Sequence, residues 1–123
     1  MTAWREAILN KNADNVEAID RVFATRAGEF IPALMVSAEG DAAERVRSFS
    51  TRVLGKLHPA ESADLMRRLL ADPSQYVRFN AAWALGELGD RNATAPLRHL
   101  ATRDPSPLVR DSAGQSLRKL GGG

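Results

Sequence analysis

The chain has 123 residues, enough for one domain, and its composition (44% hydrophobic, 6% aromatic) favours helices packed through Ala and Leu over a sheet. It has no Cys, no basic leader before an apolar run, and no apolar run near the roughly 20 residues that span a bilayer. We therefore expect no disulfide framework, no signal peptide and no membrane contact, and a cytoplasmic protein.

The net charge of +2 is unevenly distributed. Residues 1–44 hold four Lys and Arg against eight Asp and Glu, whereas residues 45–123 hold thirteen against seven. This basic excess indicates either solvated helix faces or a surface that attracts an acidic partner.

Residues 1–27 are predicted to form a pair of short helices, over about 2–10 and 14–26. The pair lacks the motif that recurs further along the chain. An atypical unit is expected at the end of a repeat array, because one of its faces meets water rather than another repeat. We therefore predict that residues 1–27 form an N-terminal cap.

The sequence after this cap repeats with a period of about thirty residues, which is typical of a solenoid. The segment Asp-Pro-Ser at 72–74 recurs at 104–106, and a related copy without the Pro begins at Asp41. In every copy an Asp stands six residues before an Arg: Asp41 with Arg47, Asp72 with Arg78, and Asp104 with Arg110. We predict repeats of two helices each over residues 28–58, 59–90 and 91–121, within one domain of residues 1–123.

The clearest helix is predicted over residues 72–89. Asp72 is expected to cap its first turn, with Pro73 at the first helical position, where a missing N–H costs nothing. Gly89 is the expected C-terminal stop.

The pattern L-x-x-L-L-x-D-P-x-x-x-V-R-x-x-A-A-x-A-L-G-x-L-G is matched nearly throughout by residues 66–73 and 77–89. It resembles HEAT repeats of the short, phycobilin-lyase-like type, and the resemblance extends over about residues 28–121. The resemblance implies an all-α fold: a right-handed α-α superhelix (HEAT/armadillo-like solenoid) of about three repeats plus the N-terminal capping helix pair. It also implies that the Asp and Arg residues of the motif form a buried ladder that holds the stack together.

No catalytic constellation is found in the sequence. His58 and His99 stand alone, without the carboxylate spacing of a metal site, and no Gly-rich loop follows a strand. His58 is interpreted as a helix-end residue and His99 as a surface residue. We therefore predict no catalytic residues, no metal and no cofactor, and a protein that is not an enzyme.

One stripe of each repeat's second helix is left over after the buried positions are assigned. In the resembling family the second helices line the concave face, so the stripes would form a patch of aromatic and basic side chains, which commonly anchor interfaces. For Phe49 and Trp83 the alternative is packing against the next repeat. The predicted partner-binding residues are Arg45, Phe49, Arg52, Lys56, Tyr76, Asn80, Trp83, Glu87, Leu108, Gln115 and Lys119.

These features predict a non-catalytic scaffold that binds another protein through the concave face of the solenoid. A second copy of the chain is an alternative partner for the same patch. The basic excess and the stackable Tyr76 and Trp83 support a nucleic-acid-binding module as an alternative function. The family resemblance adds a third, a bilin-lyase-related subunit that binds a tetrapyrrole.

Overall fold

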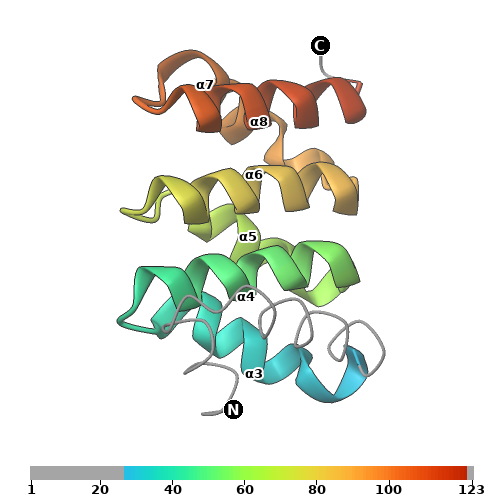
Figure 1. The fold of residues 1–123 in the computed structure, drawn as a ribbon. Coiled ribbons are helices and arrows are strands. Elements are labelled where there is room, and N and C mark those ends of the chain that lie inside the picture. The colour runs from blue at the N-terminus through green and yellow to red at the C-terminus, as the bar shows by residue number, and fades with distance from the viewer. Residues whose placement is uncertain (1–26, 122–123) are drawn as a thin grey trace.

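The computed structural model describes residues 27–121, so the cap predicted over residues 1–27 lies, except for its last position, outside the described residues. The regular structure of the described part is helical, without a strand. The elements, numbered as in Figure 1, are α3 (Ala27–Gly40), α4 (Glu44–Leu57), η1 (Ala60–Ser62), α5 (Ala63–Leu69), α6 (Gln75–Leu88), η2 (Arg91–Ala93), α7 (Thr94–Arg103) and α8 (Pro107–Lys119). Across residues 27–121 every helix is too short or too polar to cross a membrane.

Consecutive helices pair, and the pairs stack. α3 packs against α4, α5 against α6 and α7 against α8, while α6 packs against both α4 and α8. Figure 1 shows α4, α6 and α8 one above another along the stack. This arrangement confirms the predicted all-α solenoid.

Two glycines allow the helices of this layer to approach closely. A Cβ atom at Gly55 would lie 2.5 Å from the ring of Trp83, and one at Gly86 would lie 2.5 Å from the hydroxyl of Ser116. Any larger residue would push α4 from α6, or α6 from α8. The largest apolar side chains that are fully buried among the described residues are Leu34, Leu54, Leu65, Met66, Leu85 and Leu97.

The helix caps differ from the prediction. α6 begins one residue after Ser74, whose hydroxyl accepts two first-turn backbone N–H bonds at 3.2 and 3.4 Å. Asp72 instead accepts the N–H of Ser74 at 2.8 Å, and Pro73 precedes the helix. Ser106 caps α8, with its hydroxyl accepting one first-turn N–H bond, from Val109, at 3.4 Å. The prediction was wrong because Asp and Ser are both capping residues, and the Asp carboxylate is held by an Arg of the preceding pair.

The Asp and Arg residues of the motif form the predicted ladder. Arg47 donates from Nε and Nη2 to the carboxylate of Asp72 at 3.1 and 3.2 Å, and Arg78 binds Asp104 likewise at 2.9 and 3.2 Å. Each Arg also donates from Nη1 to the carbonyl of the Asp six residues before it. Because an Arg guanidinium binds both oxygens of each carboxylate, these hydrogen bonds fix neighbouring helix pairs in register.

Candidate functional site

The structure divides the predicted partner-binding stripe into exposed and packed side chains. The exposed members are Arg45, Lys56, Tyr76, Leu108, Gln115 and Lys119. The half-buried members are Arg52, Trp83 and Glu87, and the buried members are Phe49 and Asn80. The stripe is therefore interrupted at the middle of α4 and of α6, and its role in binding a partner stays a prediction.

Asn80 and Trp83 contact a neighbouring helix, whereas Phe49 packs beside Arg52 of its own helix. Phe49 is 6% exposed, and the guanidinium of Arg52 lies over its ring, 5.2 Å from the centroid. The Asn80 side-chain amide donates to the carbonyl and the hydroxyl of Ser48, both at 3.1 Å. Trp83 lies against the backbone of α4 at Gly55, which matches the packing alternative considered for this residue.

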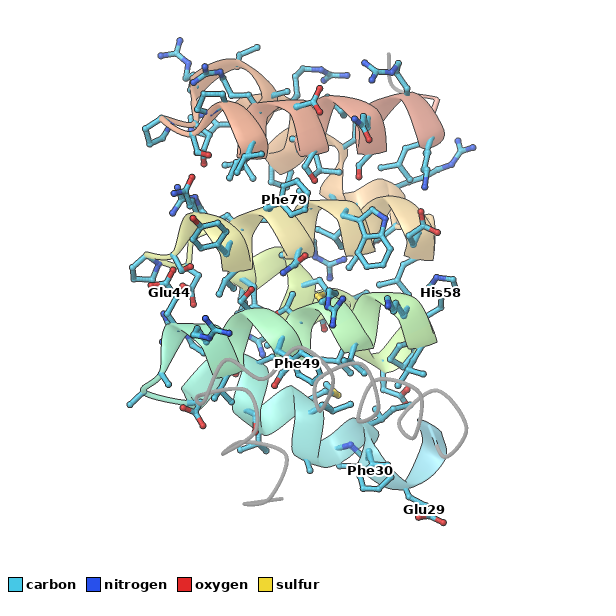
Figure 2. The ribbon with its side chains drawn as sticks, viewed as in Figure 1. Glu29, Phe30, Glu44, Phe49, His58 and Phe79 are labelled. Carbon is cyan, nitrogen blue, oxygen red and sulfur yellow. The ribbon has the colours of Figure 1, made fainter. Side chains whose placement is uncertain are left out.

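A charged cluster lies where α4 and α6 end. His58 follows α4, and Figure 2 shows it at the opposite end of this helix from Glu44. Its Nε2 lies 3.7 Å from Oε2 of Glu87 on α6, while the other carboxylate oxygen of Glu87 accepts a hydrogen bond from Lys119 on α8. We call His58, Glu87 and Lys119 the His58 cluster.

The backbone conformation at His58 positions its side chain. His58 has φ 56° and ψ 43°, in the left-handed region, and its N–H donates to the carbonyl of Leu54 at 3.0 Å. Glycine is usual at such a helix end, and Gly89 takes it after α6 with φ 69°. The interpretation of His58 as a helix-end residue is confirmed, but its imidazole also reaches the next helix pair.

The His58 cluster borders a pocket of about 350 Å³ between η1 and the end of α6. A third polar side chain of this pocket, Asp90, accepts hydrogen bonds from Arg67 and from the N–H of Asn92, so its carboxylate is already engaged. The His58 side chain is 49% exposed and that of Glu87 is 24% exposed. An accessible imidazole beside a carboxylate is a pair that can take up and return protons.

A second pocket, of about 480 Å³, lies at the opposite ends of these helices and is partly lined by prolines. Its polar walls bond to each other: the hydroxyl of Ser74 donates to Glu44 and that of Ser106 donates to Gln75, both at 2.7 Å. These groups serve the stack, so the pocket beside the His58 cluster is the better candidate for a functional site.

Sequence reasoning missed the His58 cluster because its members belong to different repeats. One signal was available: Glu87 occupies the stripe position that is Lys56 in the preceding repeat and Lys119 in the following one. An acid between two bases along a stack predicts cross-repeat pairing. Within residues 27–121, no group of three or more His, Cys, Asp or Glu side chains is placed to hold a metal ion.

This chain matches one family model and is similar to curated proteins named deoxyhypusine hydroxylase. Residues 31–118 match the family described as HEAT repeats. Deoxyhypusine hydroxylase-B of Oryza sativa subsp. japonica is 31% identical over 120 residues, covering 94% of this chain and 39% of the rice protein. The deoxyhypusine hydroxylase of Saccharomyces cerevisiae is 30% identical over 111 residues, covering 86% of this chain and 34% of the yeast protein. The chain thus spans well under half the length of these curated relatives.

The relatives correct two predictions. They are named as hydroxylases, which are enzymes, so the predictions of a non-catalytic protein-binding scaffold and of a protein that is not an enzyme are wrong. The nucleic-acid-binding and tetrapyrrole-binding alternatives fit these relatives no better. The predictions failed because the repeat motif reports positions that build the stack, whereas chemistry resides in surface residues that vary from one repeat protein to another.

Proposed function

The chain belongs to the HEAT-repeat family, and we propose that it acts in the hydroxylation of deoxyhypusine, the reaction for which its relatives are named. The observation that carries this proposal is the 31% identity to the rice hydroxylase over 94% of this chain. The chain spans 39% of that protein, and the proposal is that these repeats suffice for the reaction.

We place the substrate at the pocket beside the His58 cluster. The pocket is a concavity with two accessible polar side chains, which is the usual character of a small-molecule site. Lys119 holds one oxygen of Glu87, and the other oxygen faces the imidazole. Glu87 and His58 would then bind a polar part of the substrate and hold or accept a proton there, while Lys119 positions Glu87. The added oxygen atom and the two-electron oxidation would come from a separate oxidant, molecular oxygen.

The test is an oxygen-incorporation assay. The purified chain is added to an extract of yeast cells that lack their own deoxyhypusine hydroxylase, together with a deoxyhypusine substrate that the yeast enzyme hydroxylates. Mass spectrometry then follows the gain of one oxygen atom by the substrate. We expect hydroxylation with the wild-type chain and about 100-fold slower hydroxylation with Glu87→Gln, which keeps the shape of the side chain but not its charge.

The yeast enzyme serves as the positive control, and Glu61→Gln, an exposed carboxylate on η1, is the matched control for loss of charge. If the yeast enzyme hydroxylates the substrate while the wild-type chain does not, the proposed function fails. If the chain is active and Glu87→Gln is equally active, the function stands but its site lies elsewhere.

The finer sequence-based assignments remain proposals. Membership of the phycobilin-lyase-like subfamily is supported by the motif over residues 66–89, and a cytoplasmic location by the absence of Cys. The exposed members of the predicted stripe, such as Lys56 and Tyr76, lie on the same helix layer as the His58 cluster, and we propose them as additional substrate contacts.

A further inference from the structure

Within residues 27–121, Arg110 has the geometry of the ladder without a ladder partner. Its Nη1 donates to the carbonyl of Asp104 at 2.6 Å, as Arg47 and Arg78 do to the Asp six residues before them. In Arg47 and Arg78 the Nε and Nη2 groups then bind a carboxylate of the next helix pair. Among residues 27–121, no carboxylate is bound to the guanidinium of Arg110. The bond from Nη1 therefore holds the Arg110 guanidinium in position, and its Nε and Nη2 groups can bind a carboxylate from outside the described residues.

The nearby carboxylates of Asp104 and Asp111 do not bind the Nε and Nη2 groups of Arg110. Asp104 is bound at both oxygens by Arg78, and Asp111 accepts a hydrogen bond from Gln115 at 2.9 Å. Arg110 is half-buried, so its charge is less screened than that of a fully exposed side chain.

The outer side of α8 differs from the faces that stack. Figure 1 shows α8 with α7 at one end of the stack. Where α6 has Gly86, which permits the contact with Ser116, α8 has Arg118 at the equivalent position. A Cβ atom at Gly114 would lie 3.8 Å from Nη1 of Arg118, so the Arg118 side chain extends across this face of α8. A helix that approached α8 as α8 approaches α6 would meet the Arg118 side chain.

The start of α8 also lacks a stacking contact. α4 and α6 begin with Glu44 and Gln75, whose side-chain oxygens accept the cap Ser hydroxyl of the next pair. α8 begins with Pro107, which has no side-chain acceptor. The face therefore carries an Arg in the ladder position, but neither the small residue nor the side-chain acceptor with which α6 contacts α8.

We propose that the outer face of α8 binds an acidic peptide segment of a partner protein, with one carboxylate on Arg110 and a second on Arg118. Positions 110, 114 and 118 follow one another on a single helix face, and a rise of 1.5 Å per residue separates Arg110 from Arg118 by about 12 Å. In an extended peptide, side chains four residues apart lie on one side and about 13 Å apart. The match in spacing and the opposite charges select two acidic residues at i and i+4. This proposal does not depend on the proposed hydroxylation.

The test uses three fluorescein-labelled peptides on a Gly/Ser background, with Asp at i and i+4, with Asp at i only, and with Asn at both positions. Fluorescence anisotropy at low ionic strength measures their binding to the wild-type chain. We expect the two-Asp peptide to bind most tightly and the Asn peptide not to bind. Arg110→Lys should weaken binding of the two-Asp peptide about tenfold, because Lys keeps the charge but cannot form the bidentate contact.

Arg118→Gln should reduce the affinity for the two-Asp peptide to that for the one-Asp peptide. Its side chain makes no hydrogen bond or ion pair within the described residues, so the variant is expected to fold. Arg91→Gln on η2 is the matched control for loss of one positive charge, and it should bind like the wild type.

Equal binding by wild type, Arg110→Lys and Arg91→Gln would overturn the proposal, because the attraction would then be non-specific. Equal binding of the Asp and Asn peptides would overturn it as well. Analytical ultracentrifugation tests whether a second copy of the chain binds this face instead. If the wild type self-associates and Arg110→Gln abolishes the association, the face binds a second copy and the proposal is overturned.

Discussion

Arg78 binds Asp104 of the following helix pair through two contacts, Nε to Oδ2 at 2.9 Å and Nη2 to Oδ1 at 3.2 Å. The two side chains are only 14% and 3% exposed. Removing the guanidinium would leave the Asp104 carboxylate without its countercharge in a nearly buried position. We expect Arg78→Ala to lower the free energy of unfolding by about 3–5 kcal/mol, measured by urea denaturation. Arg68→Ala, which removes a surface partner of Glu39, should cost much less; similar losses would contradict a structural role for the ladder.

Gly86 determines how closely α8 approaches α6. A Cβ atom there would lie 2.5 Å from Oγ and 2.8 Å from Cβ of Ser116, whose hydroxyl donates to the carbonyl of Ala82 at 2.6 Å. We expect Gly86→Ala to lower the free energy of unfolding by about 1–3 kcal/mol through overpacking. Gly40→Ala is the control, since nothing lies within 4 Å of the added methyl group. A thermal melt in which both variants behave alike would show that the two helices can move apart freely.

His58→Gly separates the backbone role of this residue from its side-chain role. Glycine takes the left-handed conformation without the steric cost of about 1 kcal/mol paid by other residues, so the variant should be at least as stable as the wild type. The same change removes the imidazole that faces Glu87. We expect hydroxylation to fall while the melting temperature holds or rises. Unchanged hydroxylation would exclude His58 from the reaction.

The exposed pair of Glu39 and Arg68 gives a pH-dependent prediction. Hydrogen bonds from Arg68 lower the pKa of the Glu39 carboxyl from its ordinary value of 4.5. A lowered pKa in the folded state means that the pair stabilises the fold above the ordinary pKa, and that this stabilisation is lost as the pH falls through the lowered value. NMR titration of the Glu39 carboxyl carbon should show the pKa rising in Arg68→Gln and staying lowered in Arg103→Gln, which changes a charge on α7. No rise in Arg68→Gln would mean that the pair does not form in solution.

The fold was predictable because it depends on spacing along the chain. A thirty-residue period with apolar residues at helical intervals allows few arrangements other than stacked helix pairs. The resemblance to HEAT repeats implied the ladder of Asp and Arg residues. The predicted cap failed at Asp72 for a local reason. A Ser that caps the helix follows two residues later, and short-range rules do not decide between two suitable residues.

The candidate site depended on distances between helices that no local pattern contains. Phe49 and Asn80 were predicted on an open stripe, yet both are buried, and the side-chain amide of Asn80 binds Ser48 of the preceding helix pair. His58 was predicted to have no functional partner, yet the stacking of α6 on α4 places Glu87 beside it. Helical periodicity fixes which way a side chain points from its own helix. Whether that direction leads to water, to a core or to a charge is set by how closely the next pair packs, and here the glycines at 55 and 86 make that approach unusually close.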